Sequence, residues 1–327
     1  MTSYSGSRPS PRLTSVGPWG ESVLQNLPKS VRVYEVGPRD GLQNEEAFVP
    51  SEDKIELIKS LSDAGLPYVE ITSFVHPRWI PALADADRVA AAFEPSAATT
   101  YTALVPNERG LDRALKTPLR EVAVFMSASE THNARNINKS RQETFTAFKP
   151  VFQRCHDAGV AVRAYVSTVW GCPYEGAVSP AEAVEVAEKL LELGAYEISL
   201  GDTIGVGNPA QTCAVLETFR TRLGLSQIAM HMHDTRGLAL ANCLVGLEYG
   251  VTTFDTSIAG LGGCPYAPGA SGNLATEDLV GMLHGMGIET GIDFDKLVTA
   301  GRMATQLLGR TLPGRTLQAC MAEHTDD

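Results

Sequence analysis

Cysteine is scarce in this sequence, and long apolar runs are missing. Six cysteines are scattered over 327 residues without the paired spacing of metal-binding motifs, in a chain far longer than disulfide-rich secreted domains. No segment approaches the roughly 18 consecutive apolar residues of a membrane-spanning helix. These absences exclude a membrane protein and a disulfide-held secreted domain, and we expect reduced thiols in the cytoplasm.

Positive charge is also in short supply. The chain has 27 lysines and arginines against 38 acidic residues, which gives a formal net charge of -11. A charge of this sign repels nucleic acids and anionic membranes at long range, which excludes both as main partners. An anionic small-molecule ligand must therefore meet a locally basic patch.

The first residues lack acidic side chains and the apolar run of a secretory signal peptide, and they are rich in Ser, Pro and Gly. We expect a disordered tail over residues 1–25, with an organelle transit peptide as the alternative. A single catalytic domain that includes helices near the C-terminus should then occupy residues 26–327, because a chain with 43% hydrophobic residues can bury a large core.

Short β-branched or apolar runs recur between longer segments of helical pattern, at the spacing of repeated βα units. Eight such units close a TIM barrel, so we predict a single α/β domain of the (β/α)8 class. An open doubly wound sheet is the alternative, but its G-x-G-x-x-G motif is absent after the first strand. The eight predicted strands cover residues 31–36, 68–74, 99–105, 121–126, 160–168, 197–200, 228–233 and 251–258.

Two of the intervening helices have clear end signals. In the first, Ser51 is expected to cap the N-terminus and Gly65 to end the helix. In the second, Ser179 precedes Pro180 at the first helical position, and Gly194 ends the helix. Helices with these termini are typical of the segments that connect barrel strands.

Polar side chains gather where the predicted strands end, which is where a barrel of this kind carries its chemistry. His231 and His233 are two apart on one strand, so their side chains leave the same face with Cα atoms roughly 6.5 Å apart. Asp40 follows the first strand, which neighbours strands seven and eight once the barrel closes. Two imidazoles and a carboxylate suit a divalent metal, and Asn273 could supply a further oxygen.

The remaining histidines and the charged residues near strand ends have simpler interpretations. Arg39 and Asp40 alone would be a surface ion pair, and only the nearby histidines change that. Glu70 lies in an apolar strand and needs a partner, so it either fixes Arg39 or orients a metal ligand. We interpret the other histidines as hydrogen-bonded structural residues: His76, His132, His156, His284 and His324.

A glycine-rich segment, residues 260–273, follows the eighth predicted strand. Its length and glycine content are typical of a mobile active-site loop that covers the mouth of a barrel. Cys264 in this loop could deliver a proton to a carbanion after closure. Most cysteines are inert small apolar residues, and Cys172 lies in a second Gly-Cys-Pro-Tyr, so the local motif does not decide the role.

Four motifs together resemble the 3-hydroxy-3-methylglutaryl-CoA lyase family. They are the Gly-Pro-Arg-Asp-Gly-Leu-Gln-Asn that begins at Gly37, the Glu-Ile-Thr-Ser-Phe that begins at Glu70, the His-x-His-Asp-Thr that begins at His231, and the glycine-rich loop. The resemblance covers residues 30–310. Arg-Asp-Gly-x-Gln and His-x-His recur across the wider metal-dependent Claisen-type superfamily, so the loop carries the assignment to the lyases.

The resemblance implies a TIM-barrel enzyme that cleaves 3-hydroxy-3-methylglutaryl-CoA to acetyl-CoA and acetoacetate, a reaction of leucine degradation and ketone-body formation. It implies Mg²⁺ or Mn²⁺ bound by Asp40, His231, His233 and Asn273. Arg39 would lie beside the thioester carbonyl, Cys264 would be the catalytic acid, and either Asp40 or His233 the base. Glu70 and Asp202 would support the site. The resemblance also implies a homodimer or higher homo-oligomer.

Coenzyme A carries anionic phosphates, which need basic or polar contacts. The candidates are Gln43, Arg135, Lys139, Arg141, Arg310 and Arg315, and for each basic side chain a solvated surface position is the alternative. The chain departs from the family at Glu46, where a basic residue is usual, and at His76, where a small polar residue is usual. These departures bear on CoA contacts and on acyl-group preference.

Three alternatives to the namesake reaction stay open. The substrate could be citramalyl-CoA or a longer branched hydroxyglutaryl-CoA. A condensing synthase of the same superfamily shares the Arg-Asp and His-x-His elements, although such enzymes carry an extra regulatory or lid region. A non-catalytic CoA- or metal-binding module would keep the fold without the reaction, but the intact set of polar residues argues against it.

Overall fold

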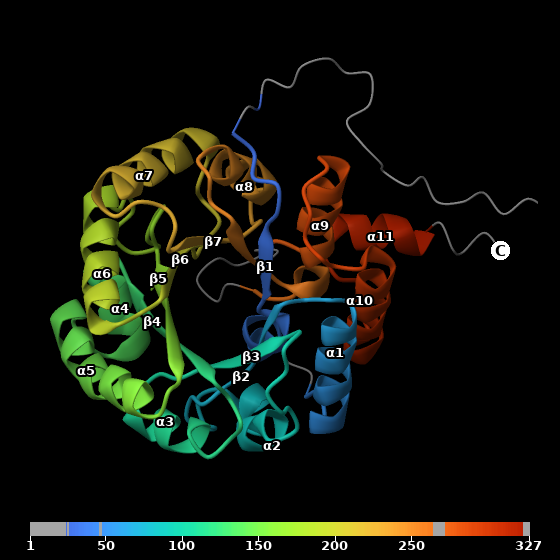
Figure 1. The fold of residues 1–327 in the computed structure, drawn as a ribbon, viewed down its shortest axis with the longest axis horizontal. Coiled ribbons are helices and arrows are strands. Elements are labelled where there is room, and N and C mark those ends of the chain that lie inside the picture. The colour runs from blue at the N-terminus through green and yellow to red at the C-terminus, as the bar shows by residue number, and fades with distance from the viewer. Residues whose placement is uncertain (1–23, 25, 46–47, 264–271, 323–327) are drawn as a thin grey trace, which may run out of the picture.

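Eight parallel strands close into a barrel in the computed structural model, which describes residues 24, 26–45, 48–263 and 272–322 (Figure 1). Parallel pairing of the last strand with the first, with Tyr34 opposite Asp255, completes the ring. This closure confirms the predicted (β/α)8 barrel and excludes the open doubly wound sheet. The strands are β1 Arg32–Glu35, β2 Tyr68–Ser73, β3 Thr100–Leu104, β4 Glu121–Ser127, β5 Ala161–Ser167, β6 Glu197–Asp202, β7 Ile228–Met232 and β8 Thr253–Thr256.

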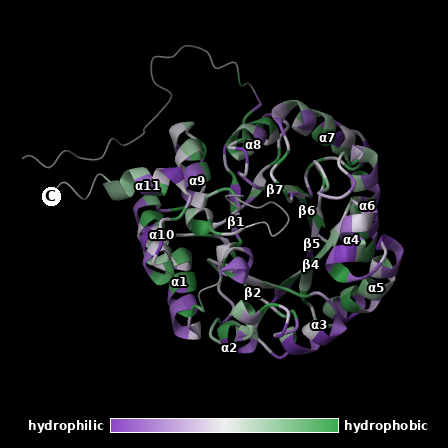
Figure 2. Cartoon of the chain, turned by 180° about the vertical axis from the view of Figure 1, so that it is seen from behind, coloured by the Kyte–Doolittle hydropathy of each residue, from purple (hydrophilic) through white to green (hydrophobic). Residues whose placement is uncertain are grey.

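Helices surround the strands and cover them from solvent (Figure 1). Along the ring they mix hydrophobic and hydrophilic residues, as expected for helices with one face on a core (Figure 2). The last three stack beside the barrel, where α10 packs on α1. The helices are α1 Ser51–Asp63, α2 Ala86–Ala90, α3 Glu108–Ala114, α4 Glu130–Ile137, α5 Arg141–Asp157, α6 Pro180–Leu193, α7 Pro209–Arg222, α8 Ala239–Glu248, α9 Thr276–Gly285, α10 Phe294–Leu308 and α11 Arg315–Ala322.

The helix end signals are largely confirmed. Gly65 and Gly194 follow α1 and α6 with φ of 91° and 111°, a left-handed conformation that other residues adopt only with strain. Ser179 precedes α6 and Pro180 is its first residue. The prediction that Ser51 caps α1 is wrong: it is the first helical residue, and its hydroxyl donates to Asp85 Oδ2 at 2.7 Å instead.

Charged side chains lie inside the barrel, where branched aliphatic residues are more usual. Arg163 on β5 is fully buried and contacts Glu197 on β6 and Asp255 on β8. Because isolated buried charges are costly, each of these groups is satisfied by the others. The strands therefore bring polar chemistry into the barrel beneath its carboxyl-end mouth.

Several expectations concern residues at or beyond the limits of the described chain. The expected tail, residues 1–25, lies outside the described residues apart from Leu24. None of the helices in the described part of the chain is both long and apolar enough to cross a membrane. Cys155, Cys172, Cys213 and Cys243 are free thiols in the described part of the chain.

Candidate active site

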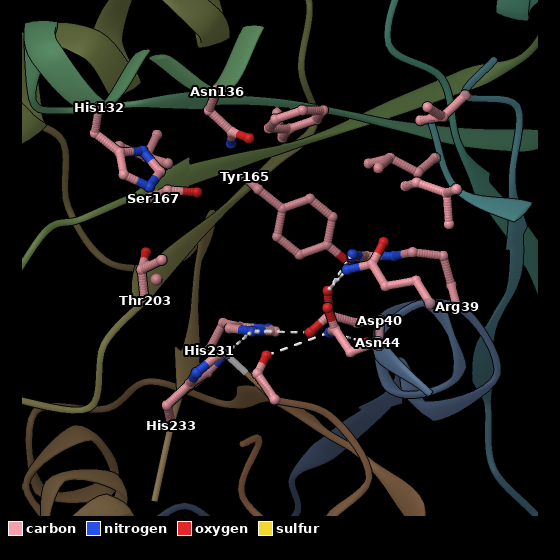
Figure 3. Close-up of a pocket in the computed structure, with 18 of the residues that line it drawn as sticks. Arg39, Asp40, Asn44, His132, Asn136, Tyr165, Ser167, Thr203, His231 and His233 are labelled. Carbon is pink, nitrogen blue, oxygen red and sulfur yellow. Dashed lines mark hydrogen bonds and ion pairs between the residues drawn. The ribbon is translucent and has the colours of Figure 1, made fainter. Parts of the chain in front are cut away.

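A cavity of about 360 Å³ opens at the carboxyl ends of the strands. Its walls come from β3 to β7 and from the segments that follow β1, β2, β4, β6 and β8. Figure 3 shows Arg39 and Asp40 on one side of it, the two histidines of β7 at its base, and His132 and Thr203 on the far side. The cavity thus coincides with the place where the sequence predicted the polar cluster.

Arg39 and Asp40 project from one π-helical turn, Gly37–Gly41, that directly follows β1. Such turns are rare and occur frequently at functional sites. A Cβ atom at Gly37 would lie 2.6 Å from Glu35 Oε1, and one at Gly41 would lie 2.7 Å from Leu261 Cβ. Glycine at both ends therefore lets the turn pack tightly against the segment after β8.

Three side chains that can bind a metal converge at the base of the cavity. Nε2 of His231 and Nε2 of His233 are 3.3 Å apart, and Asp40 Oδ2 is 4.0 Å from His231 Nε2. One ligand atom from each residue lies within 4.8 Å of the other two, and all three residues are nearly buried. Two imidazole nitrogens and one carboxylate oxygen at this separation can hold a divalent metal ion.

Asn273 joins this group through backbone pairing. Leu274 N donates to Met232 O at 3.0 Å and Asp234 N donates to Gly272 O at 2.9 Å, so the chain after the glycine-rich loop runs beside the end of β7. The Asn273 amide nitrogen donates to Asp40 Oδ2 at 2.8 Å. Its Oδ1 is buried and has no hydrogen-bond partner among the described residues, which fits a fourth metal ligand. We call Asp40, His231, His233 and Asn273 the ligand cluster.

The electrostatics of the ligand cluster favour a bound cation. Burial raises the pKa of Asp40, but Arg39 and then the two histidines outweigh this effect, so the net pKa is below its ordinary value. Burial, with help from His231, lowers the pKa of His233 to about 4. At neutral pH the cluster therefore offers an ionised carboxylate and a neutral His233 imidazole, which are the forms that bind metal.

Arg39 is held from behind by Glu70 of β2. Arg39 Nε and NH2 donate to Glu70 Oε2 at 2.9 and 2.7 Å, and the hydroxyl of Tyr165 donates to the same oxygen at 2.8 Å. The guanidinium lies 5.3 Å from the centre of the Tyr165 ring. Burial lowers the pKa of Arg39, but Glu70 and Asp40 raise it by a larger amount. The net pKa therefore lies above its ordinary value, and Arg39 stays charged. Of the two roles expected for Glu70, the contacts match the fixing of Arg39.

Gln43 and Asp202 differ in their relation to the cavity, because Asp202 is not among its described lining residues. Gln43 lines the cavity, and its amide nitrogen donates to Asp40 Oδ1 at 2.7 Å. Asp202, at the end of β6, instead accepts backbone N–H groups from Val206 and Gly207 at 3.0 and 2.9 Å. Burial raises its pKa to about 6. The hydrogen bonds that Asp202 accepts stabilise the turn between β6 and α7.

None of the predicted basic contacts for CoA is among the described lining residues of the cavity. Arg135 on α4 stacks 4.2 Å from the centre of the Tyr174 ring, one residue before Asn136, which lines the cavity. Lys139 follows α4. Arg310 forms an ion pair with Glu45, which follows the cavity residue Asn44.

The other two candidates make contacts within the protein, Arg141 through its side chain and Arg315 through its backbone. Arg141 Nε donates to Glu130 at 2.9 Å, and it also donates to a backbone carbonyl. Arg315 is the first residue of α11, and its backbone N–H donates to Asp278 at 3.2 Å.

Cys264 and Glu46 lie outside the described residues. Gly263 and Gly272 border residues 264–271 within the glycine-rich segment. Gly263 lines the cavity and its carbonyl accepts a hydrogen bond of 3.2 Å from Asn44, while Gly272 pairs with Asp234 as above.

Several cavity residues were not identified from the sequence. Tyr165 and Ser167 come from β5, Thr203 follows β6, and Trp79 is an exposed residue of the segment after β2. His132, interpreted above as a structural histidine, lines the cavity and also shares a hydrogen bond of 2.7 Å with Ser127 Oγ. The only sequence signal for these positions is that each lies near the end of a strand.

Several known proteins match this chain over most of its length. The family model described as HMGL-like matches residues 30–304. Hydroxymethylglutaryl-CoA lyase YngG of Bacillus subtilis is 54% identical over 291 residues, which is 89% of this chain and 97% of that protein. The mitochondrial hydroxymethylglutaryl-CoA lyase of Mus musculus is 50% identical over 307 residues, or 94% of each chain.

Solved structures agree with the sequence matches. The crystal structure of the Bacillus subtilis HMG-CoA lyase superposes with a TM-score of 0.89 at 52% identity and covers 91% of this chain and 100% of its own. An HMG-CoA lyase from Acinetobacter baumannii, described in complex with coenzyme A and 3-methylmalate, superposes with a TM-score of 0.85 at 39% identity, over 89% of this chain and 95% of its own. The chain therefore belongs to the HMGL-like family.

Proposed function

We propose that this chain is a hydroxymethylglutaryl-CoA lyase, which cleaves 3-hydroxy-3-methylglutaryl-CoA to acetyl-CoA and acetoacetate with Mg²⁺ or Mn²⁺. The observation that carries the proposal is the convergence of the ligand cluster beside Arg39 at the base of one cavity. The lyases named above are about half identical to this chain over most of its length, which supports the same reaction.

Asp40, His231, His233 and Asn273 would hold the metal, the last through its free Oδ1. A divalent metal held there would act as a Lewis acid and lower the pKa of the tertiary hydroxyl of the substrate. The carboxylate and amide oxygens suit Mg²⁺ or Mn²⁺, and the ligand cluster offers no thiolate for a thiophilic ion.

Proton removal starts the cleavage. Asp40 or His233 is our candidate base for the hydroxyl proton of the substrate, because both line the cavity beside the proposed metal position. Collapse of the alkoxide breaks the bond between C2 and C3, forms the ketone of acetoacetate and leaves the electron pair on the enolate of acetyl-CoA. Arg39, fixed by Glu70 and always charged, stabilises the negative charge on the thioester oxygen.

Protonation of the enolate carbon completes the reaction. The Cys264 thiol is our candidate for this acid, on the basis of the glycine-rich motif that contains it. Gly263, the residue before it, lines the cavity, so the motif begins at the site. The thiol gives its proton to C2 and regains one from water after product release.

Contacts with CoA are proposed at the cavity mouth. Gln43 lies beside Asp40, where it can reach the thioester end of the substrate. Arg135 precedes the lining residue Asn136 on α4, Lys139 follows the same helix, and Arg310 pairs with Glu45 beside the lining residue Asn44. We assign these three basic residues to the phosphates and the pantetheine arm. The description of the Acinetobacter lyase with coenzyme A supports a CoA thioester as the substrate class. We further propose a cytoplasmic homodimer or higher homo-oligomer.

Product analysis tests the reaction. Purified protein is incubated with Mg²⁺ and a panel of thioesters that includes 3-hydroxy-3-methylglutaryl-CoA, citramalyl-CoA and a longer branched hydroxyglutaryl-CoA, and products are identified by mass spectrometry. We expect acetyl-CoA and acetoacetate from the first ester at the highest rate. Faster cleavage of another ester would transfer the proposal to that substrate, and net condensation in a parallel incubation with acetyl-CoA and an oxo acid would indicate a synthase. No turnover in either direction would indicate a binding module.

A further inference from the structure

The charged interior of the barrel connects directly to the ligand cluster. His231 on β7 lies opposite Asp255 on β8 in the strand register. His231 Nδ1 is 3.3 Å from Asp255 Oδ2, while its Nε2 faces Asp40 and His233. The two ring nitrogens therefore meet different environments, a carboxylate below and the ligand cluster above.

Asp255 accepts three hydrogen bonds from two neighbouring side chains. Arg163 NH2 donates to Asp255 Oδ1 at 2.6 Å, and Arg163 NH1 donates to Oδ2 at 3.1 Å, which is a bidentate pair. The Ser199 hydroxyl donates to Oδ2 at 2.6 Å. Arg163 and Asp255 are both almost fully buried, so water does not compete for these contacts.

Arg163 continues the chain of ion pairs toward the opposite end of the barrel. Its Nε donates to Glu197 Oε1 at 2.8 Å, and Glu197 also pairs with Arg32, which is partly exposed. The positive charge of Arg163 lies between two carboxylates. Its attraction offsets the desolvation cost of burying Asp255 as an anion.

The two histidines of the cluster differ in this respect. His231 has the Asp255 carboxylate behind it, whereas Nδ1 of His233 is buried with no hydrogen-bond partner among the described residues. An ionised carboxylate only accepts hydrogen bonds, so its partner nitrogen must carry a proton. A neutral imidazole protonated at Nδ1 leaves the Nε2 lone pair free for a metal.

We propose that Asp255, clamped by Arg163, is the positioning residue that fixes His231 in the tautomer and orientation with Nε2 available to the metal. The inference rests on the metal set of the proposed function, but it concerns residues that touch neither substrate nor ion. Groups of this kind orient metal ligands, and their loss typically weakens metal affinity by about 10- to 100-fold.

The substitution Asp255→Asn tests this role, because the amide keeps the shape and can still accept from Arg163 while offering N–H to His231. Mn²⁺ affinity of the metal-free proteins is measured by electron paramagnetic resonance, which needs no substrate. We expect the dissociation constant to rise by about 10- to 100-fold in Asp255→Asn.

Glu197→Gln is the matched control, since it changes a buried carboxylate that pairs with the same arginine but has no contact with His231. We expect its Mn²⁺ affinity to stay within about threefold of wild type. Equal affinities in wild type and Asp255→Asn, or an equal loss in Glu197→Gln, would overturn the inference. A wild-type protein that binds no Mn²⁺ would instead overturn the metal site of the proposed function.

A second measurement uses the unaltered fold, in case Asp255→Asn does not fold. Two-bond ¹H–¹⁵N correlation spectra of protein with ¹⁵N-labelled histidine report the tautomer of each ring, and the spectrum of His231→Gln identifies the His231 signals. At about pH 8 we expect His231 in the metal-free wild-type protein to carry its proton on Nδ1, which faces Asp255. A proton on Nε2 would contradict the role of Asp255.

Discussion

Arg39 and Glu70 form a buried ion pair in which two guanidinium nitrogens share a single carboxylate oxygen, Glu70 Oε2. The other oxygen, Oε1, is buried and has no hydrogen-bond partner among the described residues. The pair leaves Arg39 NH1 directed at Asp40. Glu70 thus sets the position of the group that we assign to the thioester oxygen.

Removal of the Glu70 carboxylate should harm both stability and turnover. In Glu70→Ala the Arg39 charge is left buried without its main partner, which costs about 3–5 kcal/mol in the free energy of unfolding. Displacement of Arg39 by about 1 Å should lower kcat roughly 10²-fold. Glu70→Gln keeps an acceptor at the Oε2 position and should lose less on both counts. Urea unfolding and steady-state kinetics check this, and an unchanged kcat in Glu70→Ala would show that Arg39 does not depend on Glu70.

Trp79 should contribute to substrate binding alone. It lines the cavity mouth and is 77% exposed, so Trp79→Ala removes contact area for the thioester with a stability change within about 0.5 kcal/mol. We expect KM to rise about 3- to 10-fold with kcat nearly unchanged, the pattern of lost uniform binding. Phe48→Ala is the matched control, because Phe48 is 67% exposed but is not a described lining residue of the cavity. Equal KM values for the two variants would remove Trp79 from the binding site.

The Cys264 thiol should matter for turnover and not for metal binding. Loss of a general acid typically lowers the rate about 10²- to 10⁴-fold, so we expect a loss of this size in kcat for Cys264→Ala. Cys172→Ala is the control: it lies in the second Gly-Cys-Pro-Tyr, is buried and has its thiol 3.0 Å from Ser129 Oγ. Kinetics of both variants at saturating Mg²⁺ make the comparison. Wild-type kcat in Cys264→Ala would remove the thiol from the reaction.

Stability should fall as the pH rises toward 8. Burial raises the pKa of Glu277 to about 8, so the folded protein holds a proton that the unfolded chain releases near pH 4.5. The stability from this group is fully present below about pH 4.5 and is lost as the pH rises through about 8. Glu35, with a pKa of about 7, acts in the same direction.

Urea unfolding midpoints from about pH 6.5 to about pH 8 check this dependence, because below that range the buried neutral histidines, with pKa values of about 4, act in the opposite direction. We expect the wild-type midpoint to decline and the decline to be smaller in Glu277→Gln, which cannot ionise. Glu289→Gln, a change at an exposed position, should decline like wild type. A midpoint that rises with pH in wild type would show that these buried acids do not control the profile.

The strands and the paired histidines could be predicted from the sequence because their signals are local. Alternation of apolar runs with capped helices indicates βα units, and the spacing of His231 and His233 places both imidazoles on one face of a strand. The ring closure that brings Asp40 to them follows from the count of units. These features depend on a few residues at a time.

The partners inside the barrel could not be predicted because they depend on the stagger of strands far apart in the chain. Arg163 and Asp255 lie 92 positions apart, and their contact exists only at the observed register of β5 through β8. A charged residue in an apolar strand, such as Glu70, indicates that it has a buried partner. The same reasoning applies to Arg163 and Asp255, but it gives no partner.

Metal dependence of turnover tests the central claim most directly. Protein stripped with a chelator is titrated with Mn²⁺ while acetyl-CoA release is followed. We expect turnover to fall to background without metal and to return in full at one Mn²⁺ per chain, while His233→Ala recovers little under the same titration. Full turnover of the stripped wild-type protein would contradict a metal held by Asp40, His231, His233 and Asn273 as the centre of this lyase.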